Sequence, residues 1–425
     1  MSTPVPDELA RACADVRPAG GGDAVGGQPA RFVAEPASTA EASALLRAAA
    51  ALDLSVLPRG RATRLSWGDP PRGCDLIVST RQLDQVIEHA AGDLVVTVQA
   101  GVALDALQQR LAAEGQRLAL DPPGGASVGG LIATNATGPL RFRYGAPRDL
   151  LIGITIVRAD GTIAKAGGKV VKNVAGYDLG KLFAGSYGTL GLITEATFRL
   201  HPLPAAAQWV VAETDDAATA AALVLSAARS PVAPSAIEFD WPSASAPLTV
   251  SVLVEGDEAS VAERAAVLAA ASVASDTAGP RPAQTKRAGH DPVSLAPGAT
   301  ATLIQTAFWA GRLADILGAI RGRGSEHGLD PAISGSAAAG VLEIYVPADA
   351  DGERTAAFVA GLRAAVAQAD GDMPTGSVVV LDAPAEVRAA VDMWGPVPSL
   401  DLMRAVKDQF DPGHRMAPGR LAGGI

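Results

Sequence analysis

A glycine-rich stretch between Lys169 and Glu195 constrains the fold of this chain more than any other feature. It reads K-V-V-K-N-V-A-G-Y-D-L-G-K-L-F-A-G-S-Y-G-T-L-G-L-I-T-E and follows neither the period of a helix nor the alternation of a strand. Each glycine would weaken a helix by about 1 kcal/mol. Polar side chains run through the stretch, which favours a loop that faces a ligand. The alternative is an ordinary glycine-rich connection between two strands.

Two earlier stretches are also dense in small residues. R-G-R-A-T-R-L-S-W-G begins at Arg59, directly after a predicted strand at residues 54–58. Backbone N–H groups in such a turn can converge on phosphate oxygens. D-P-P-G-G-A-S-V-G-G-L-I-A-T-N-A-T-G covers residues 121–138 and predicts a helix that begins near Ser127 and presents its free N–H groups outward. Neither stretch contains the dinucleotide motif G-x-G-x-x-G or the Walker motif G-x-x-x-x-G-K-[ST].

Length and charge limit the class of protein. A chain of 425 residues exceeds what one hydrophobic core normally serves, so two domains are expected. Hydrophobic residues make up 48% and charged residues 19%, which indicates a globular protein rather than a disordered one. The formal net charge of −10, with no cluster of Lys and Arg, argues against a nucleic-acid-binding surface.

Cysteine and histidine usage argues against a disulfide framework and a protein-held metal. Cys13 and Cys74 form no C-x-x-C pair, and no H-E-x-x-H or H-x-H spacing occurs. The N-terminus has neither the basic start nor the apolar core of a signal peptide. No uncharged apolar run approaches the roughly 18–20 residues of a membrane helix. We therefore expect a cytoplasmic protein, with peripheral attachment to the inner membrane through a partner left open.

The order of predicted elements divides the chain into four parts. Residues 1–30, rich in Gly, Pro and Ala, are expected to form a flexible arm. Residues 31–204 are expected to form the ligand-binding domain, with a capping box of Ser38 and Glu41 and a hairpin of residues 150–158 and 162–165. Residues 205–395 predict a smaller α+β domain with an antiparallel sheet. Residues 396–425 contain a helix and many turn residues, and should fold back on the first domain.

Taken in order, the small-residue stretches resemble the vanillyl-alcohol-oxidase family of FAD-binding domains, also called the PCMH-type fold. P-R-G-R-A-T-R-L resembles the family's first pyrophosphate loop, S-V-G-G-L-I-A-T-N-A-T-G its second segment, and R-Y-G-A-P-R-D-L-L-I-G a third. K-N-V-A-G-Y-D-L followed by G-S-Y-G-T-L-G-L-I-T-E is typical of the branch that oxidises glycolate and D-lactate. With the closing D-P-G-H-R-M-A-P-G-R, the chain is most similar to the FAD-binding E subunits of bacterial glycolate oxidases.

The resemblance implies an α+β fold, with a two-subdomain FAD-binding domain followed by a smaller cap domain. In those oxidases two related flavin-binding chains and an iron–sulfur chain convert glycolate to glyoxylate, and electrons pass to an acceptor other than NAD. It also implies a catalytic flavin subunit and an iron–sulfur subunit as partners, with a small 2-hydroxy acid as substrate. Covalent-flavin members carry a histidine in the first loop. This loop has none, so FAD is expected to be noncovalent.

Carried over residue by residue, the resemblance assigns cofactor-binding roles to several positions. The first loop would hold the FAD pyrophosphate, and the second segment would line the isoalloxazine and ribityl side. The remaining positions belong to the third motif, to the flavin or substrate approach, and to backbone bonds near the end of the glycine-rich stretch. The residues are Arg59, Gly60, Arg61, Ala62 and Thr63; Ser127, Gly129, Gly130, Thr134, Asn135 and Gly138; Tyr144 and Asp149; Asn173 and Tyr177; and Gly191, Leu192 and Ile193.

Two departures from the family bear on catalysis. Catalytic members carry G-H-x-G-D-G-N in the cap domain, where this chain reads S-G-S-A-A-A-G-V-L-E-I at residues 334–344. Ala417 stands where the closing motif usually has Asn. No catalytic residue is assigned; Arg141 and Arg143 could bind a substrate carboxylate or be structural. A self-sufficient D-2-hydroxy-acid dehydrogenase and a non-catalytic structural or electron-relay subunit remain as alternatives.

Overall fold

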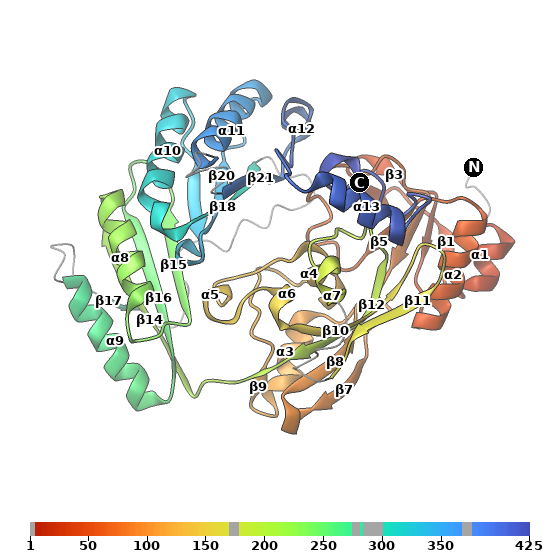
Figure 1. The fold of residues 1–425 in the computed structure, drawn as a ribbon, viewed down its shortest axis with the longest axis horizontal. Coiled ribbons are helices and arrows are strands. Elements are labelled where there is room, and N and C mark those ends of the chain that lie inside the picture. The colour runs from red at the N-terminus through yellow and green to blue at the C-terminus, as the bar shows by residue number, and fades with distance from the viewer. Residues whose placement is uncertain (1–4, 170–177, 274–280, 284–300, 368–375) are drawn as a thin grey trace. The chain divides into compact units, whose positions relative to one another are not determined.

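The computed structural model describes residues 5–169, 178–273, 281–283, 301–367 and 376–425, which form two compact units (Figure 1). The first unit comprises Met1–Ala136, Gly145–Leu203 and Pro396–Ile425, and the second Thr137–Tyr144 and Pro204–Gly395. The sequence predicts that residues 31–204 form one domain, but the structure places residues 137–144 in the second unit. Their segment joins the second unit because Leu140 is buried against Ala236 and Leu253.

The first subdomain of the first unit is built on a four-stranded sheet in the order β1-β4-β6-β5. β4, β6 and β5 run parallel, and β1 pairs antiparallel at the edge. Helix α2 packs over the sheet with Leu45 and Leu46 fully buried. The elements are α1 (Asp7–Ala12), β1 (Val16–Pro18), β2 (Ala24–Val25), β3 (Gln28–Pro29), β4 (Phe32–Ala34), α2 (Thr39–Ala51), β5 (Val56–Arg59) and β6 (Leu76–Ser79).

The N-terminal residues differ from the expected flexible arm. Residues 5–30 contain α1 and β1–β3, and Leu9 is fully buried in the core beneath α2. The Ala14 N–H donates to Glu41 Oε1 at 2.7 Å. Ser38 Oγ caps α2 by accepting from the Glu41 N–H at 3.1 Å, as predicted, but the Glu41 carboxylate binds Ala14 and Ala37 instead of closing the box. Composition concealed this because one leucine and one glutamate anchor an otherwise small-residue segment.

Asp23, from the same N-terminal segment, is buried between two arginines. Its Oδ2 accepts from Arg17 Nη1 at 2.8 Å, and its Oδ1 accepts from Arg59 Nη1 at 2.9 Å. The Gly20 N–H also donates to Oδ2 at 2.9 Å. Arg17, together with the Gly20 N–H and Arg59, holds the pKa of Asp23 well below its usual range, although burial opposes this.

We expect Asp23→Asn to lower the free energy of unfolding by about 1.5–3 kcal/mol at neutral pH, because it removes hydrogen bonds to a charged group. The folded pKa lies below the unfolded value of about 3.9, so this stabilisation is complete above that value and is lost as the pH falls through the folded pKa. Urea denaturation of wild type and variant over a pH series tests this. The two stabilities should converge in acid; a difference that stays constant with pH would contradict the assignment.

The second subdomain of the first unit is a five-stranded antiparallel sheet in the order β11-β10-β12-β8-β7. The predicted hairpin forms β10 and β11, turned at Gly161 with φ +81°. The elements are β7 (Val86–Ala90), η1 (Ala91–Asp93), β8 (Val95–Gln99), α3 (Leu104–Ala112), β9 (Gln116–Arg117), α4 (Val128–Thr134), α6 (Pro147–Leu150), β10 (Leu151–Val157), β11 (Ile163–Gly167), α7 (Gly180–Phe183), β12 (Leu192–Arg199) and β13 (His201–Pro202). β9 and β13 form a separate two-stranded pair.

The second unit is an α+β domain with an antiparallel sheet, as predicted. Its eight strands follow the order β17-β14-β16-β15-β19-β20-β18-β21. The strands are β14 (Ala206–Thr214), β15 (Ala236–Trp241), β16 (Leu248–Gly256), β17 (Arg281–Ala283), β18 (Thr302–Phe308), β19 (Ala332–Gly335), β20 (Val341–Val346) and β21 (Gly376–Asp382). The helices are α5 (Arg141–Tyr144), α8 (Ala217–Arg229), α9 (Glu258–Val273), η2 (Ala310–Arg312), α10 (Leu313–Glu326), η3 (Ala337–Ala339), α11 (Gly352–Val366) and α12 (Ala385–Ala390).

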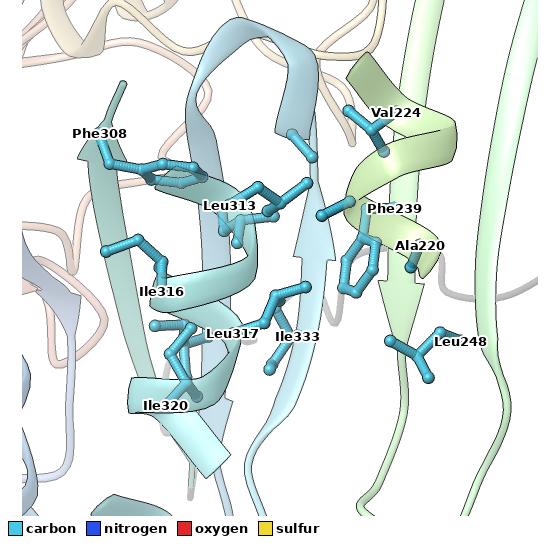
Figure 2. Packing of buried hydrophobic residues seen from close by; sticks show 14 of the residues in the cluster. Ala220, Val224, Phe239, Leu248, Phe308, Leu313, Ile316, Leu317, Ile320 and Ile333 are labelled. Atoms are coloured by element: carbon cyan, nitrogen blue, oxygen red, sulfur yellow. The ribbon is translucent and has the colours of Figure 1, made fainter. Parts of the chain in front are cut away.

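Helices α8 and α10 cover one face of this sheet (Figures 1 and 2). Figure 2 shows Ile316 and Ile320 of α10 facing the side chains of the strands beneath. Phe239 of β15 and Ile333 of β19 are almost fully buried in the same core. Local signals set the helix starts: Asp216 caps α8 by accepting from the Thr219 N–H at 2.7 Å.

The C-terminal segment belongs to the first unit. Helix α13 (Leu400–Phe410) is followed by turns and by η4 (Ala422–Gly424). The Val56 N–H donates to Arg415 O at 2.8 Å, and the Ala417 N–H donates to Val56 O at 2.7 Å. Met416 thereby forms a parallel bridge with Val56, and both Met416 and Ala417 are fully buried. The segment around Met416 therefore lies beside the strand that leads into the first small-residue loop.

Candidate cofactor site

A pocket in the first unit gathers the first loop, α4 and the start of β12. It encloses about 740 Å³ of empty space, counting the part open to solvent. Its lining includes four arginines and no acidic residue. The lining residues are Pro58, Arg59, Gly60, Arg61, Ala62, Thr63, Arg64, Leu65, Thr80, Ser127, Gly129, Gly130, Ala133, Thr134, Tyr187, Gly188, Gly191, Leu192, Ile193 and Arg420. The pocket suits a long, anionic ligand with an apolar part.

The first loop offers a row of backbone donors to this pocket. Among the residues that the structure describes, none accepts a hydrogen bond from the N–H groups of Gly60, Arg61, Ala62 or Thr63. Ala62 adopts the left-handed conformation with φ +61°. Successive amides with one left-handed residue form a concave nest that binds anions. Gly60 is half-buried and residues 61–63 are exposed, so these amides are open to a ligand, and a diphosphate at this loop fits the residues present.

Glycine lets three segments approach one another around the pocket. A Cβ on Gly60 would overlap Ser127 Oγ, and one on Gly129 would lie 2.8 Å from Ala100 Cβ. A Cβ on Gly188 would lie 3.1 Å from the Pro58 ring. Backbone, not side chains, therefore forms much of the wall.

The sequence predicts that free N–H groups at the start of α4 point outward, but in the structure these groups have hydrogen-bond acceptors. The Val128 N–H donates to Val102 O at 2.9 Å and the Gly129 N–H to Ala100 O at 2.7 Å. The Gly130 N–H donates to Ser127 Oγ at 3.3 Å. These donors are satisfied because the first turn docks on the chain that leaves β8. The helix contributes its glycine surface to the pocket.

Side chains fasten the first loop to its surroundings. Arg61 Nε donates to Gly125 O at 2.8 Å, and Arg64 Nη2 donates to Pro123 O at 2.7 Å. These two bonds join the first and second small-residue stretches. The net effect of the arginines is a positive potential around the loop, although Asp23 balances Arg59.

Another part of the wall comes from the end of the glycine-rich stretch. Gly191 has φ +154°, and a Cβ there would lie 2.8 Å from Val157 O. Leu192 and Ile193 begin β12 and are buried. Tyr187 has φ +53°, and burial raises the pKa of its phenol to about 12, so it is neutral at physiological pH. This part of the wall is therefore largely apolar and carries no charge.

The structure brings together most of the residues that the sequence singled out. Twelve of them line the pocket, from the first loop, α4 and β12: Arg59, Gly60, Arg61, Ala62, Thr63, Ser127, Gly129, Gly130, Thr134, Gly191, Leu192 and Ile193. Asn173 and Tyr177 lie outside the described residues. Sequence reasoning missed Thr80, Tyr187 and Arg420, which line the pocket from separate parts of the chain. Only the Y-G-T and P-G-R motifs could have pointed to the last two.

Four of the expected residues do not line the pocket. Asn135 ends α4 with φ +48°, and its Oδ1 accepts from the Arg148 N–H at 3.3 Å. Asp149 Oδ2 accepts from the Ala146 N–H at 2.8 Å and starts α6. Gly138 and Tyr144 belong to the second unit, where the Tyr144 hydroxyl donates to Glu255 at 3.3 Å. These polar groups satisfy local backbone or sheet partners.

The positions that bear on catalysis have structural roles: residues 334–344 lie in strands and a short helix, and Arg141 and Arg143 make hydrogen bonds to hydroxyl groups. Residues 334–344 form the end of β19, η3 and β20. Arg141 donates to Thr137 Oγ1 at 2.9 Å, and Arg143 donates to Ser235 Oγ at 3.3 Å. Within the described ranges, no group of three or more His, Cys, Asp and Glu side chains could hold a metal. In the same ranges no helix has both the length and the apolar character to cross a membrane.

The strained Ala62 offers a first test of the loop. A left-handed non-glycine residue costs about 1–2 kcal/mol, so we expect Ala62→Gly to keep or tighten FAD binding. Ala62→Val should weaken it about tenfold, because a β-branched residue resists that conformation. Ala233→Val is the matched control, because Ala233 has φ +51° but lies in the second unit. Titration of flavin fluorescence measures all three; unchanged affinity in Ala62→Val would contradict the role of the loop.

Comparisons with known proteins agree with this geometry. Residues 30–167 match the family model described as an FAD binding domain. Glycolate oxidase subunit GlcD of Bacillus subtilis (strain 168) is 34% identical over 209 residues, 49% of this chain and 44% of that protein. D-2-hydroxyglutarate dehydrogenase of Xanthomonas citri pv. viticola is 37% identical over 174 residues, 40% of this chain and 37% of that protein. Mitochondrial D-lactate dehydrogenase [cytochrome] 1 of Saccharomyces cerevisiae is 35% identical over 215 residues, 50% of this chain and 37% of that protein.

The chain thus spans less than half the length of these curated relatives. A solved structure of alkyldihydroxyacetonephosphate synthase aligns with a TM-score of 0.68 at 17% identity, covering 92% of this chain and 77% of that one. That likeness concerns the fold alone. Together with the family model it confirms the predicted α+β, PCMH-type FAD-binding fold, and FAD is the cofactor of its first unit.

Proposed function

We propose that this FAD-binding chain is the FAD-binding subunit of a complex that oxidises glycolate to glyoxylate. Electrons would pass through an iron–sulfur partner to an acceptor other than NAD. The observation that carries the proposal is the nest of free amides at Gly60–Thr63 in a pocket without acidic residues. Similarity to the glycolate oxidase subunit and to D-2-hydroxy-acid dehydrogenases supports a 2-hydroxy acid as substrate.

The residues of this chain would bind and orient the cofactor. When bound, FAD would accept the two electrons that are released when the hydroxyl-bearing carbon of the substrate is oxidised. The amides of the first loop and the arginines around it would hold the diphosphate, and Ser127, Gly129 and Gly130 would let the flavin approach the backbone. Arg59, Arg61 and Thr63 would complete the cradle. We infer that FAD binds noncovalently, because the first loop lacks the histidine that the resemblance associates with covalent flavin.

No base or substrate cation is assigned to this chain. Hydroxyl oxidation needs a proton acceptor near the substrate and a cation for its carboxylate. Residues 334–344 contain no histidine, and Arg141 and Arg143 are engaged with hydroxyls of the second unit. We therefore propose that a catalytic flavin subunit contributes the main site of chemistry.

One alternative is a self-sufficient D-2-hydroxy-acid dehydrogenase. Similarity to the D-lactate and D-2-hydroxyglutarate dehydrogenases favours it. In that case a 2-hydroxy acid would reduce the flavin of the isolated chain, without any partner subunit.

Anaerobic flavin reduction separates these functions. The purified chain, loaded with FAD, is mixed with glycolate, D-lactate or D-2-hydroxyglutarate, and with acetate as the control that has no hydroxyl. We expect the visible flavin band to persist with the chain alone and to bleach with glycolate when the catalytic and iron–sulfur subunits are added. Bleaching of the chain alone would favour the dehydrogenase. Full activity of a complex that contains an FAD-deficient variant would favour a structural or relay subunit.

A further inference from the structure

Arg420 connects the C-terminal segment to the far end of the first loop. Its Nη1 donates to Leu65 O and its Nη2 to Trp67 O, both at 2.9 Å. The side chain also lines the pocket, although the residue is only 4% exposed. The free amides of Gly60–Thr63 lie at the near end of the same loop. A planar guanidinium with two fixed donors sets the direction of two carbonyls at once.

The rest of the C-terminal segment holds Arg420 in place. Met416 pairs with Val56, the first residue of the strand that leads into the loop. The Arg72 N–H donates to Pro418 O at 2.8 Å, and the Arg420 N–H donates to Ala417 O at 3.2 Å. The bridge to Met416 thereby fixes the strand before the loop, and the fork of Arg420 fixes the far end of the loop.

The charge of Arg420 also reaches the pocket. It lowers the pKa of Tyr187, opposing the larger effect of burial, and Tyr187 is itself part of the pocket wall. In a site with low exposure this positive charge is weakly screened. A bound diphosphate would gain from it, whereas an uncharged flavin would not.

We propose that Arg420 is a positioning residue that orients the first loop for a diphosphate, so that the C-terminal segment sets the preference for FAD over uncharged flavins. This inference rests on the proposed use of the pocket for FAD. The fork fixes the peptide planes of Leu65 and Trp67, and the amides that precede them face the pocket as a consequence. A purely structural arginine would stabilise the protein but would affect all flavins alike.

The test compares FAD with riboflavin, which has no phosphate. The full-length apoprotein is titrated with each, in wild type, Arg420→Met, Arg420→Lys and Arg404→Gln. We expect Arg420→Met to weaken FAD about 10- to 100-fold, the loss of a charge-assisted hydrogen-bond pair, with riboflavin affinity unchanged within about twofold. Arg420→Lys should rescue part of the loss, because it keeps the charge but not the fork.

Arg404 is the matched control, because it lies in the same C-terminal segment, 3.3 Å from exposed Asp401, and is not part of the pocket lining. Arg404→Gln should bind both flavins as wild type does. Equal weakening of FAD and riboflavin in Arg420→Met, or no weakening, would overturn the inference. If Arg420→Met does not fold, Arg420→Lys takes its place. A lower ratio of FAD to riboflavin affinity than in wild type supports the inference, and an unchanged ratio overturns it. Absence of FAD binding by wild type would instead refute the proposed function.

Discussion

Lys407→Met is expected to lower the free energy of unfolding of the first unit by about 3–5 kcal/mol, the cost of breaking a buried ion pair by removing one partner. The Lys407 side chain is 1% exposed, and its ammonium donates to Asp411 Oδ2 and Thr189 O at 2.7 Å and to Met416 O at 2.9 Å. Burial lowers its pKa, and the nearby Asp411 charge opposes this. The variant would leave the Asp411 carboxylate buried without its cation.

Denaturation in urea, followed by circular dichroism, measures this loss. Lys181→Met is the control, because Lys181 makes a more exposed pair with Asp178 at 3.4 Å and should cost at most about 1 kcal/mol. Lys407→Met combined with Asp411→Leu should recover part of the stability, since the uncompensated charge is gone. A loss below about 1 kcal/mol in the single variant would contradict the role of this pair.

Gly129→Val is expected to weaken FAD binding by about 10- to 100-fold. A Cβ on Gly129 would lie 2.8 Å from Ala100 Cβ and 3.1 Å from Ala100 O. Backbone on the far side cannot yield, so α4 must move away from the chain that leaves β8. Overpacking of this kind costs about 1–3 kcal/mol, and the movement shifts Ser127 and Gly130 in the pocket wall.

The retention of flavin through gel filtration and its titrated affinity check this result. Gly92→Ala is the control: it lies in the same unit, with nothing within 4 Å of the added Cβ. Circular dichroism should show that Gly129→Val is folded. Wild-type FAD affinity in this variant would show that the flavin does not depend on the close approach of α4.

The sequence predicted elements whose signals are local. Ser38 caps its helix as predicted, and the small-residue stretches converge on one pocket. Contacts between distant residues could not be read in the same way. Arg420 and Leu65 are far apart in the chain, and Leu9 is one apolar residue in a segment that looks like an arm. Such positions depend on tertiary packing.

Helix α4 and residues 137–144 differ from the sequence expectation for the same physical reason. Free N–H groups were expected at α4, but they are satisfied by carbonyls of the chain that leaves β8. Residues 137–144 were expected in the first unit, but the apolar Leu140 packs on the sheet of the second. In each case the sequence shows what a residue can bind, and the fold decides which partner is near.

The amount of FAD released from the purified chain tests the central claim most directly. The protein is saturated with FAD, freed of excess flavin by gel filtration and precipitated with acid, and the flavin is then measured in both fractions. A noncovalent FAD held at the nest of Gly60–Thr63 predicts an equimolar amount of FAD in the supernatant. A chain that retains no flavin after saturation, or a precipitate that keeps its flavin covalently, would contradict the account.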